Sequence, residues 1–233
     1  MNIVANDKKI HVLPKGPYEV SGDIPLKKFS IIPDEENQSE HWKEGKLYNT
    51  EGESYHLCRF GHSKNKPFCD YKHLDIGFEG HEVAHREFYD NKAKLYKGPT
   101  VDMLDDPELC AVARFCDRGK NAWRLVKDSA NPESREQAIY EASACPSGRL
   151  VAVEKDGTKI EPTLEQEIGL VQDVPKNCKG PLWVRGGILI EESNGVYYEI
   201  RNRVTLCRCG ESKNMPFCDG HHLGCEHMQG LDK

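Results

Sequence analysis

The sequence predicts an α+β protein in which two related β units flank a mixed segment of helices and strands. Three observations support this prediction: a duplicated cysteine-containing segment, strand patterns that precede it, and helix signals between its two copies. The chain has 233 residues, enough for one large domain or two to three small ones. We place the N-terminal unit at residues 1–98, the middle segment at 99–178 and the C-terminal unit at 179–233.

The duplication is clearest in two segments that contain cysteines. Residues 57–73 and 206–222 are identical at 12 of 17 positions, at a constant offset of 149 residues. The similarity extends upstream, where residues 16–22 match residues 180–186. Because an ungapped match of this length does not arise by chance, the two segments are copies of one structural unit.

Strand patterns precede the cysteines of the C-terminal copy. Residues 182–190 and 196–206 are rich in β-branched and aromatic side chains, and Asn194-Gly195 between them is typical of a hairpin turn. Each copy is therefore predicted to be a β-hairpin that leads into a cysteine-bearing loop. The N-terminal copy has a longer, charged loop at about residues 34–46, which we expect to lie in solvent.

The middle segment carries two helix signals. Asp106-Pro107 predicts the start of a helix that carries Cys110 and Cys116. Asn131-Pro132 predicts the start of a second helix, which ends near Cys145.

The remainder of the middle segment predicts a small hairpin and a linker. Residues 151–160 contain two short strand patterns, with Asp156-Gly157 as the turn between them. Residues 162–175 are expected to form a linker to the C-terminal copy.

Composition and charge exclude some classes of partner. The net charge is −6, whereas a protein whose main partner is nucleic acid usually carries a basic surplus. No apolar run is long enough to span a bilayer, and the first residues lack the features of a secretory signal. We therefore expect a cytoplasmic protein with neither a nucleic-acid nor a membrane partner.

Cysteine usage points to metal or redox chemistry. The ten cysteines are at positions 58, 69, 110, 116, 145, 178, 207, 209, 218 and 225. In a reducing compartment, clustered cysteines indicate metal ligands or redox groups rather than disulfides. Cys225 lies past the last motif, and we expect it to be a free thiol.

The C-terminal copy contains the clearest ligand pattern. Cys207 and Cys209 are separated by one residue and supply two thiolates. Cys218 and His222 are one helical turn apart, so a thiolate and an imidazole can face the same point. Three sulfur ligands and one imidazole suit zinc or an iron–sulfur cluster, and the spacing alone does not decide between them.

The segment C-R-C-G-E-S-K-N-M-P-F-C-D-G-H-H resembles the CDGSH iron–sulfur signature of the NEET-like family, with His221 where serine is usual. The resemblance implies a 2Fe–2S cluster. Cys207 and Cys209 would bind one iron, and Cys218 and His222 would bind the other. The resemblance also implies two NEET-like β units that form an intramolecular pseudo-dimer, so the chain could be monomeric.

The N-terminal copy departs from this signature. It keeps three of the four ligand positions, which are Cys58, Cys69 and His73. Phe60 replaces the second cysteine, and Tyr71 replaces the glycine. Because phenylalanine cannot bind iron, a cluster at this site would need a substitute ligand: His56, His62, water or a residue from elsewhere. The alternative is a vestigial unit that the fold still requires.

The middle segment resembles a divergent single-cluster ferredoxin, with Cys110 and Cys116 followed by Cys145 before a proline. Ala113 stands at the position of the middle cysteine. Three ligands are the pattern of a 3Fe–4S site, whereas Cys178 could supply a fourth and give a 4Fe–4S site. The alternative is that these cysteines are small buried apolar residues.

Four basic residues recur beside the two copies of the motif: Arg59, Lys64, Arg208 and Lys213. They could offset cluster charge or dock an acidic partner, but a solvated surface is the simpler expectation.

Together these patterns predict an iron–sulfur protein that acts in electron transfer, redox sensing or cluster transfer. Its partner would be a redox protein or a cluster acceptor. The sequence has no phosphate loop, dinucleotide fingerprint or nucleophile elbow, so we do not expect the chain to be an enzyme by itself. Two alternatives remain open: an electron-wiring subunit of an oxidoreductase complex, and a zinc-binding structural adaptor.

Overall fold

The computed structural model describes residues 8–50 and 52–232, in which short strands and helices alternate. The first part of the chain contains β1 (Lys9–Val12), β2 (Tyr18–Ser21), β3 (Leu26–Pro33), β4 (Ser39–Tyr48), β5 (Ser54–Leu57) and α1 (Lys72–Asp75). The middle part contains α2 (Tyr89–Lys92), β6 (Lys94–Tyr96), β7 (Val101–Asp105), η1 (Pro107–Leu109), η2 (Phe115–Asp117), α3 (Ala122–Lys127), α4 (Pro132–Ala144), β8 (Leu150–Glu154) and β9 (Lys159–Ile160). The last part contains β10 (Glu167–Asp173), β11 (Cys178–Arg185), β12 (Leu189–Glu191), β13 (Arg203–Leu206), η3 (His221–Gly224) and η4 (Glu226–Met228).

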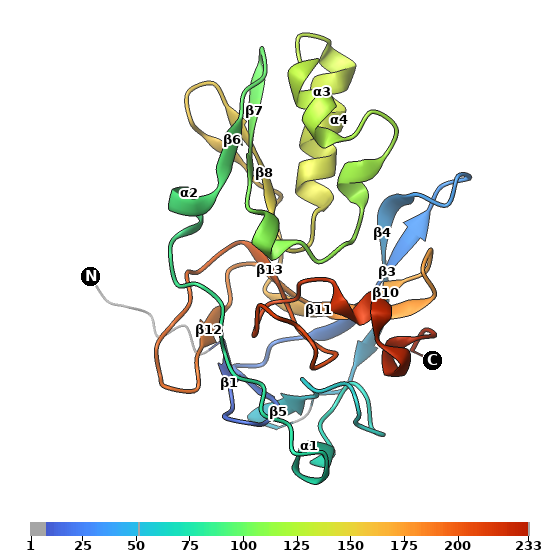
Figure 1. Cartoon of the computed structure of the whole chain (residues 1–233), viewed down its shortest axis with the longest axis vertical. Helices are drawn as coiled ribbons and strands as arrows, with labels where there is room; N and C mark the ends of the chain where they lie inside the picture. The colour runs from blue at the N-terminus through green and yellow to red at the C-terminus, as the bar shows by residue number, and fades with distance from the viewer. Residues whose placement is uncertain (1–7, 51, 233) are drawn as a thin grey trace.

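The strands of the described residues form three sheets. The first has the order β12-β1-β2-β5 and the second the order β13-β11-β10-β3-β4. The third, β6-β7-β8-β9, belongs wholly to the middle part of the chain. Figure 1 shows this third sheet with α3 and α4 at one end of the molecule, and the first sheet toward the other.

The first two sheets exchange strands between the two ends of the chain. The hairpin-like pair β2–β5 of the N-terminal copy corresponds to the pair β11–β13 of the C-terminal copy. However, β12 leaves its own copy and pairs in parallel with β1, and β3 pairs in parallel with β10. Each end of the chain therefore completes the sheet of the other.

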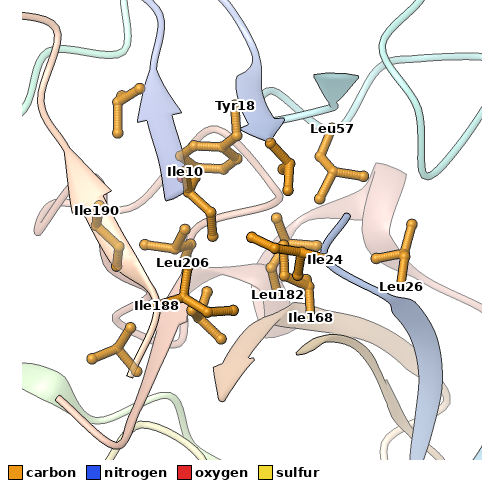
Figure 2. Packing of buried hydrophobic residues seen from close by; sticks show 14 of the residues in the cluster. Ile10, Tyr18, Ile24, Leu26, Leu57, Ile168, Leu182, Ile188, Ile190 and Leu206 are labelled. Atoms are coloured by element: carbon orange, nitrogen blue, oxygen red, sulfur yellow. The ribbon is translucent and has the colours of Figure 1, made fainter. Parts of the chain in front are cut away.

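A single hydrophobic core lies between these two sheets. The labelled members in Figure 2 are Ile10, Tyr18, Ile24, Leu26, Leu57, Ile168, Leu182, Ile188, Ile190 and Leu206. Burial alternates along β1 and β2, as expected for strands with one face on a core. Burying a side chain of this size contributes about 1.5–3 kcal/mol, so the shared core binds the two ends together.

A second core joins α3 and α4 to the third sheet. Its fully buried members include Met103, Ala138 and Leu150. The predicted helix after Asn131 is confirmed as α4. It begins there because the Asn131 side chain caps it, accepting hydrogen bonds from the amides of Glu133 and Ser134. The predicted small hairpin is confirmed as β8 and β9.

The predicted helix through Cys110 and Cys116 is wrong. After Asp106 the chain forms only the short turn η1, and Cys116 lies in a second such turn, η2. Between them, Val112 and Arg114 adopt left-handed backbone conformations with φ of 54° and 64°. A continuous right-handed helix cannot pass through such residues.

The predicted linker at residues 162–175 is also wrong, since β10 lies there and is buried along its whole length. The polar residues of this strand are typical of a linker, but in the structure each of them has a hydrogen-bond or ion-pair partner. Glu167 pairs with Lys27 and Arg185, Gln172 donates to Asp232, and Asp173 pairs with Arg114. These partners come from distant parts of the chain, so the local sequence does not reveal them.

Two strand predictions need smaller corrections. The charged loop of the N-terminal copy is limited to residues 34–38, because Ser39–Tyr48 forms the edge strand β4. Charged side chains are common on exposed edge strands, where they oppose edge-to-edge pairing. In the C-terminal copy the turn at Asn194-Gly195 is present, with the amide of Glu192 donating to Val196 O, but β13 begins only at Arg203.

None of the helices in the described part of the chain has the length and apolar character that crossing a membrane would require.

Candidate metal centre

The C-terminal ligand residues form two close pairs. Cys207 Sγ lies 3.6 Å from Cys209 Sγ, and Cys218 Sγ lies 3.4 Å from His222 Nδ1. All four side chains are at most 2% exposed. The structure therefore arranges the predicted ligand set as two buried pairs, with two donor atoms in each pair.

Backbone hydrogen bonds hold the two arms of the ligand loop together. Strand β13 ends at Leu206 and leads directly to Cys207, whose amide donates to Pro216 O at 2.7 Å. The amide of Cys218 donates to Thr205 O at 2.8 Å. These two bonds fix the spacing between the first cysteine pair and the Cys218–His222 pair.

Two polar side chains shape the turn within the loop. Ser212 Oγ donates to Phe217 O at 2.6 Å and accepts from the amide of Asn214. The carboxylate of Asp219 accepts from the amides of Lys213, at 2.8 Å, and His221, at 3.1 Å. The sequence S-K-N-M-P-F-C-D thus supplies the hydrogen bonds that fold the loop around its ligands.

Backbone amides also point at the ligand sulfurs. The amide of Gly210 donates to Cys207 Sγ at 3.3 Å, and the amide of Gly220 donates to Cys218 Sγ at 3.4 Å. Such hydrogen bonds stabilise negative charge on sulfur, both in a thiolate and in an iron-bound cysteine.

The protonation behaviour of the four groups fits metal binding. The hydrogen bond from Cys209 lowers the pKa of Cys207, and the same contact together with burial raises the pKa of Cys209. Burial raises the pKa of Cys218 and lowers the pKa of His222 to about 4. His222 is therefore neutral at ordinary pH, the form that binds metal, whereas the thiols of Cys209 and Cys218 keep their protons until a cation displaces them.

The N-terminal copy has the same backbone hydrogen bonds around its ligand loop, but one of the four ligand positions is changed. The amide of Cys58 donates to Pro67 O and the amide of Cys69 donates to His56 O, both at 2.9 Å. Cys69 Sγ lies 3.6 Å from His73 Nδ1. The second ligand pair of this copy is therefore preserved.

Phe60 fills the position of the missing cysteine in the N-terminal copy. It is 1% exposed, and its ring centroid lies 5.3 Å from that of His73. Of the suggested substitutes, His62 stacks on the ring of His227, and His56 lies 3.7 Å from a carboxylate oxygen of Glu19. A cluster on Cys58, Cys69 and His73 stays a prediction.

The middle cysteines approach one another from three elements. Cys110 follows η1, Cys116 lies in η2, and Cys145 caps the end of α4. Burial raises the pKa of Cys116 to about 12, and the nearby charges of Cys145 and Cys110 act in the same direction. Cys110 and Cys145 are therefore both near Cys116.

Cys178 has different neighbours. It starts β11 and forms an isolated bridge with Gln229 near the end of the chain. Burial and the charge of Asp173 raise its pKa to about 11, and the remaining charges that act on it belong to Arg114, Lys176 and Lys179.

Within residues 8–50 and 52–232, no three His, Cys, Asp or Glu side chains are grouped so as to hold a single metal ion. The C-terminal donors are grouped in twos instead.

Comparison with protein families agrees with this geometry. Residues 15–74 and 179–223 match the family model for iron-binding zinc fingers of the CDGSH type. Residues 96–155 match the model for divergent 4Fe-4S mono-cluster domains. The chain is an iron–sulfur protein with two CDGSH-type units around a mono-cluster unit. The resemblances that the motifs suggested are thus confirmed for all three segments. Comparisons with curated proteins and with solved structures gave no match.

Residues that the motifs do not include also support the sites. Tyr18, which is fully buried on β2, donates from its hydroxyl to Cys207 O at 2.9 Å and lies 3.1 Å from Pro216 O. Arg203 on β13 donates to the carbonyl oxygens of Cys145, Ala142 and Leu150. No local signal marks either residue, because each contacts a segment far away in the sequence.

The recurring arginines beside the motifs are buried, contrary to the expectation of a solvated surface. Arg59 is 0% exposed and donates to Gly16 O at 2.9 Å, and Arg208 is 2% exposed and pairs with Asp232. Both arginines are therefore structural partners within the fold rather than parts of a solvated surface.

Proposed function

We propose that this protein transfers electrons, using a 2Fe–2S cluster on Cys207, Cys209, Cys218 and His222 in the C-terminal CDGSH unit. The observation that carries the proposal is the arrangement of these donors as two buried pairs. A two-iron cluster requires two protein ligands on each iron, whereas a structural zinc requires four donors that converge on one point.

The ligand set favours electron uptake. An oxidised 2Fe–2S core carries about two positive charges, so three thiolates and a neutral imidazole leave it less negative than four thiolates would. Burial keeps His222 neutral, since it lowers the pKa of this residue to about 4. We therefore expect a reduction potential above that of an all-cysteine site.

A second cluster is proposed on Cys110, Cys116 and Cys145. The observation that supports it is that Cys145 and Cys110 are near enough to Cys116 for their charges to act on its thiol. The separate surroundings of Cys178 favour three protein ligands and hence a 3Fe–4S form over a 4Fe–4S form with Cys178 as the fourth ligand.

The two CDGSH-type units are proposed to form an intramolecular pseudo-dimer. The reciprocal pairings β1–β12 and β3–β10 support this arrangement, since the C-terminal unit gives β12 to one sheet and the N-terminal unit gives β3 and β4 to the other. The external partner in this proposal is a redox protein that exchanges electrons with the clusters or accepts a cluster.

Metal analysis combined with electron paramagnetic resonance (EPR) tests the proposal. Protein purified without oxygen is expected to contain iron and acid-labile sulfide, a 2Fe–2S signal on reduction and a 3Fe–4S signal when oxidised. Cys207→Ser should remove the 2Fe–2S signal and leave the signal of the middle site. Colourless protein that contains zinc and no sulfide would instead establish a structural adaptor.

Cys58→Ser is the matched control, because Cys58 occupies the same position in the N-terminal copy. If that copy holds no cluster, this variant keeps the iron content and both EPR signals of the unmodified protein. A loss of iron from Cys58→Ser with the C-terminal signal intact would show that Cys58, Cys69 and His73 hold iron as well.

A further inference from the structure

The loop that carries Cys110 packs directly on the C-terminal ligand loop. Its contact point is Gly220, which lies two residues from both Cys218 and His222. A Cβ atom added at Gly220 would lie 2.3 Å from Val112 Cγ2 and 3.7 Å from Cys110 O. The Val112 side chain of the middle unit thus packs against the C-terminal ligand loop in space that a side chain at residue 220 would fill.

The backbone at this contact is unusual. Val112 has φ of 54°, a conformation that is unfavourable for a β-branched residue. Arg114 holds it there, because this guanidinium donates to Val112 O and also pairs with both carboxylate oxygens of Asp173 on β10. The loop is therefore fixed against Gly220 by a specific ion pair.

Two further contacts join the same units. Asn214 in the C-terminal ligand loop donates to Glu108 O at 2.9 Å, close to Cys110. On the other side of the middle site, Arg203 donates to Cys145 O at 2.8 Å from β13, the strand that leads to Cys207. Both ends of the middle ligand set are tied to the C-terminal unit.

The N-terminal copy is built differently at the matching position. Tyr71 stands where Gly220 stands in the C-terminal copy, and its side chain is 63% exposed. A side chain of this size could not enter the space that Val112 leaves beside Gly220. The sequence therefore allows the middle unit to dock on the C-terminal copy and not on the N-terminal one.

We propose that the Val112–Gly220 contact is an electron path that connects the middle site to the C-terminal site within one chain. The inference rests on the proposed electron-transfer function. One electron leaves one site and the other site accepts it, with no bond formed or broken. An external one-electron reductant, dithionite in the test below, supplies it. Because tunnelling weakens steeply with distance, direct contact of the two ligand loops makes this the favoured route.

A double-mutant cycle at Gly220 and Val112 tests the path. Gly220→Ala places a methyl group against Val112 Cγ2 and should push the loops apart. Gly220→Ala combined with Val112→Ala removes that clash, since the remaining Val112 Cβ is at the ordinary distance of 3.4 Å. Tyr71→Ala is the matched control in the N-terminal copy.

Two measurements on the full-length, cluster-loaded protein report the coupling. The first is the microwave power that saturates the 2Fe–2S EPR signal, which rises when a second paramagnetic site relaxes it. The second is the rate at which an electron redistributes after sub-stoichiometric dithionite. Gly220→Ala should lower both several-fold, and Tyr71→Ala should match the unmodified protein. The double variant should restore a large part of both readouts, the remainder reflecting the strain of alanine at the φ of 89° of residue 220.

If Gly220→Ala loses its C-terminal cluster, Val112→Phe is the second variant that tests the same contact. It enlarges the same contact from the middle unit and leaves the backbone at Gly220 unchanged, so it should also lower both readouts.

The outcomes separate this inference from the proposed function. Suppose both sites are reducible, but the unmodified protein saturates at the same power as Cys116→Ser, which lacks a middle ligand. The path is then absent, although the electron-transfer function stands. If neither site accepts an electron, the proposed function itself fails.

Discussion

Glu141 on α4 carries a buried carboxyl group whose pKa lies near neutral pH. Its side chain is 1% exposed, and Oε1 accepts a hydrogen bond from Gln137 at 3.0 Å. Oε2 is buried and has no hydrogen-bond partner within the described residues. Burial raises the pKa of Glu141 to about 7, against the lowering effects of the Gln137 hydrogen bond and of Arg118, while Asp117 raises it slightly.

The sign of the pH effect follows from this shift. Between the ordinary pKa of 4.5 and about 7, the folded state keeps a proton that the unfolded state has lost. The free energy of unfolding therefore falls as the pH rises through this window, and the full penalty is present above it. A shift of this size corresponds to roughly 3 kcal/mol at pH 8.

Glu141→Gln keeps the shape and the Gln137 contact but cannot ionise. We expect it to raise the free energy of unfolding by up to about 3 kcal/mol at pH 8, with the gain shrinking toward zero near pH 5. Urea unfolding followed by circular dichroism at several pH values measures this difference. Glu136→Gln, on the exposed side of the same helix, is the matched control. A gain for Glu141→Gln that does not vary with pH would refute the reasoning.

Three further changes test the site and the fold. Phe60→Cys restores the missing ligand of the N-terminal copy. If Cys58→Ser loses no iron, Phe60→Cys should add about two irons per chain in iron analysis, and an unchanged content would then mean that the copy cannot bind a cluster. Leu182→Ala in the shared core should cost about 2–5 kcal/mol in urea unfolding, and a loss well below this would argue against one joint core. Arg203→Ala removes the donor to three buried carbonyls and the ion pair with Glu161, so it should cost about 3–5 kcal/mol. A small loss would indicate that water replaces the guanidinium.

The sequence predicts well those features that depend on neighbouring residues. The ligand spacing of the C-terminal motif is local, and the structure brings these four side chains together as two pairs. The cap at Asn131 and the turn at Asn194-Gly195 are local too, and both are present. In each case the residues that determine the geometry lie within a few positions of one another.

Features that depend on distant residues could not be predicted in this way. Strand β10 was missed because the partners of Glu167 and Asp173 lie far away in the sequence. The left-handed conformation of Val112 depends on the Arg114–Asp173 pair, and the local sequence of residues 107–116 is by itself compatible with a helix. The exchange of β3 and β12 between the sheets likewise has no local signal.

The N-terminal copy can lose a ligand and still be necessary, because the C-terminal site is built partly from it. Tyr18 on β2 donates its hydroxyl to Cys207 O, and Phe60 forms an isolated bridge with Cys209. A Cβ atom at Gly210 would lie 3.0 Å from the Cα of Phe60, so the two copies touch at backbone distance beside the ligands. The requirement at residue 60 is therefore steric as well as chemical. A buried phenylalanine satisfies the packing although it cannot bind iron, whereas a loss of the β2 strand would remove support from the neighbouring ligand loop.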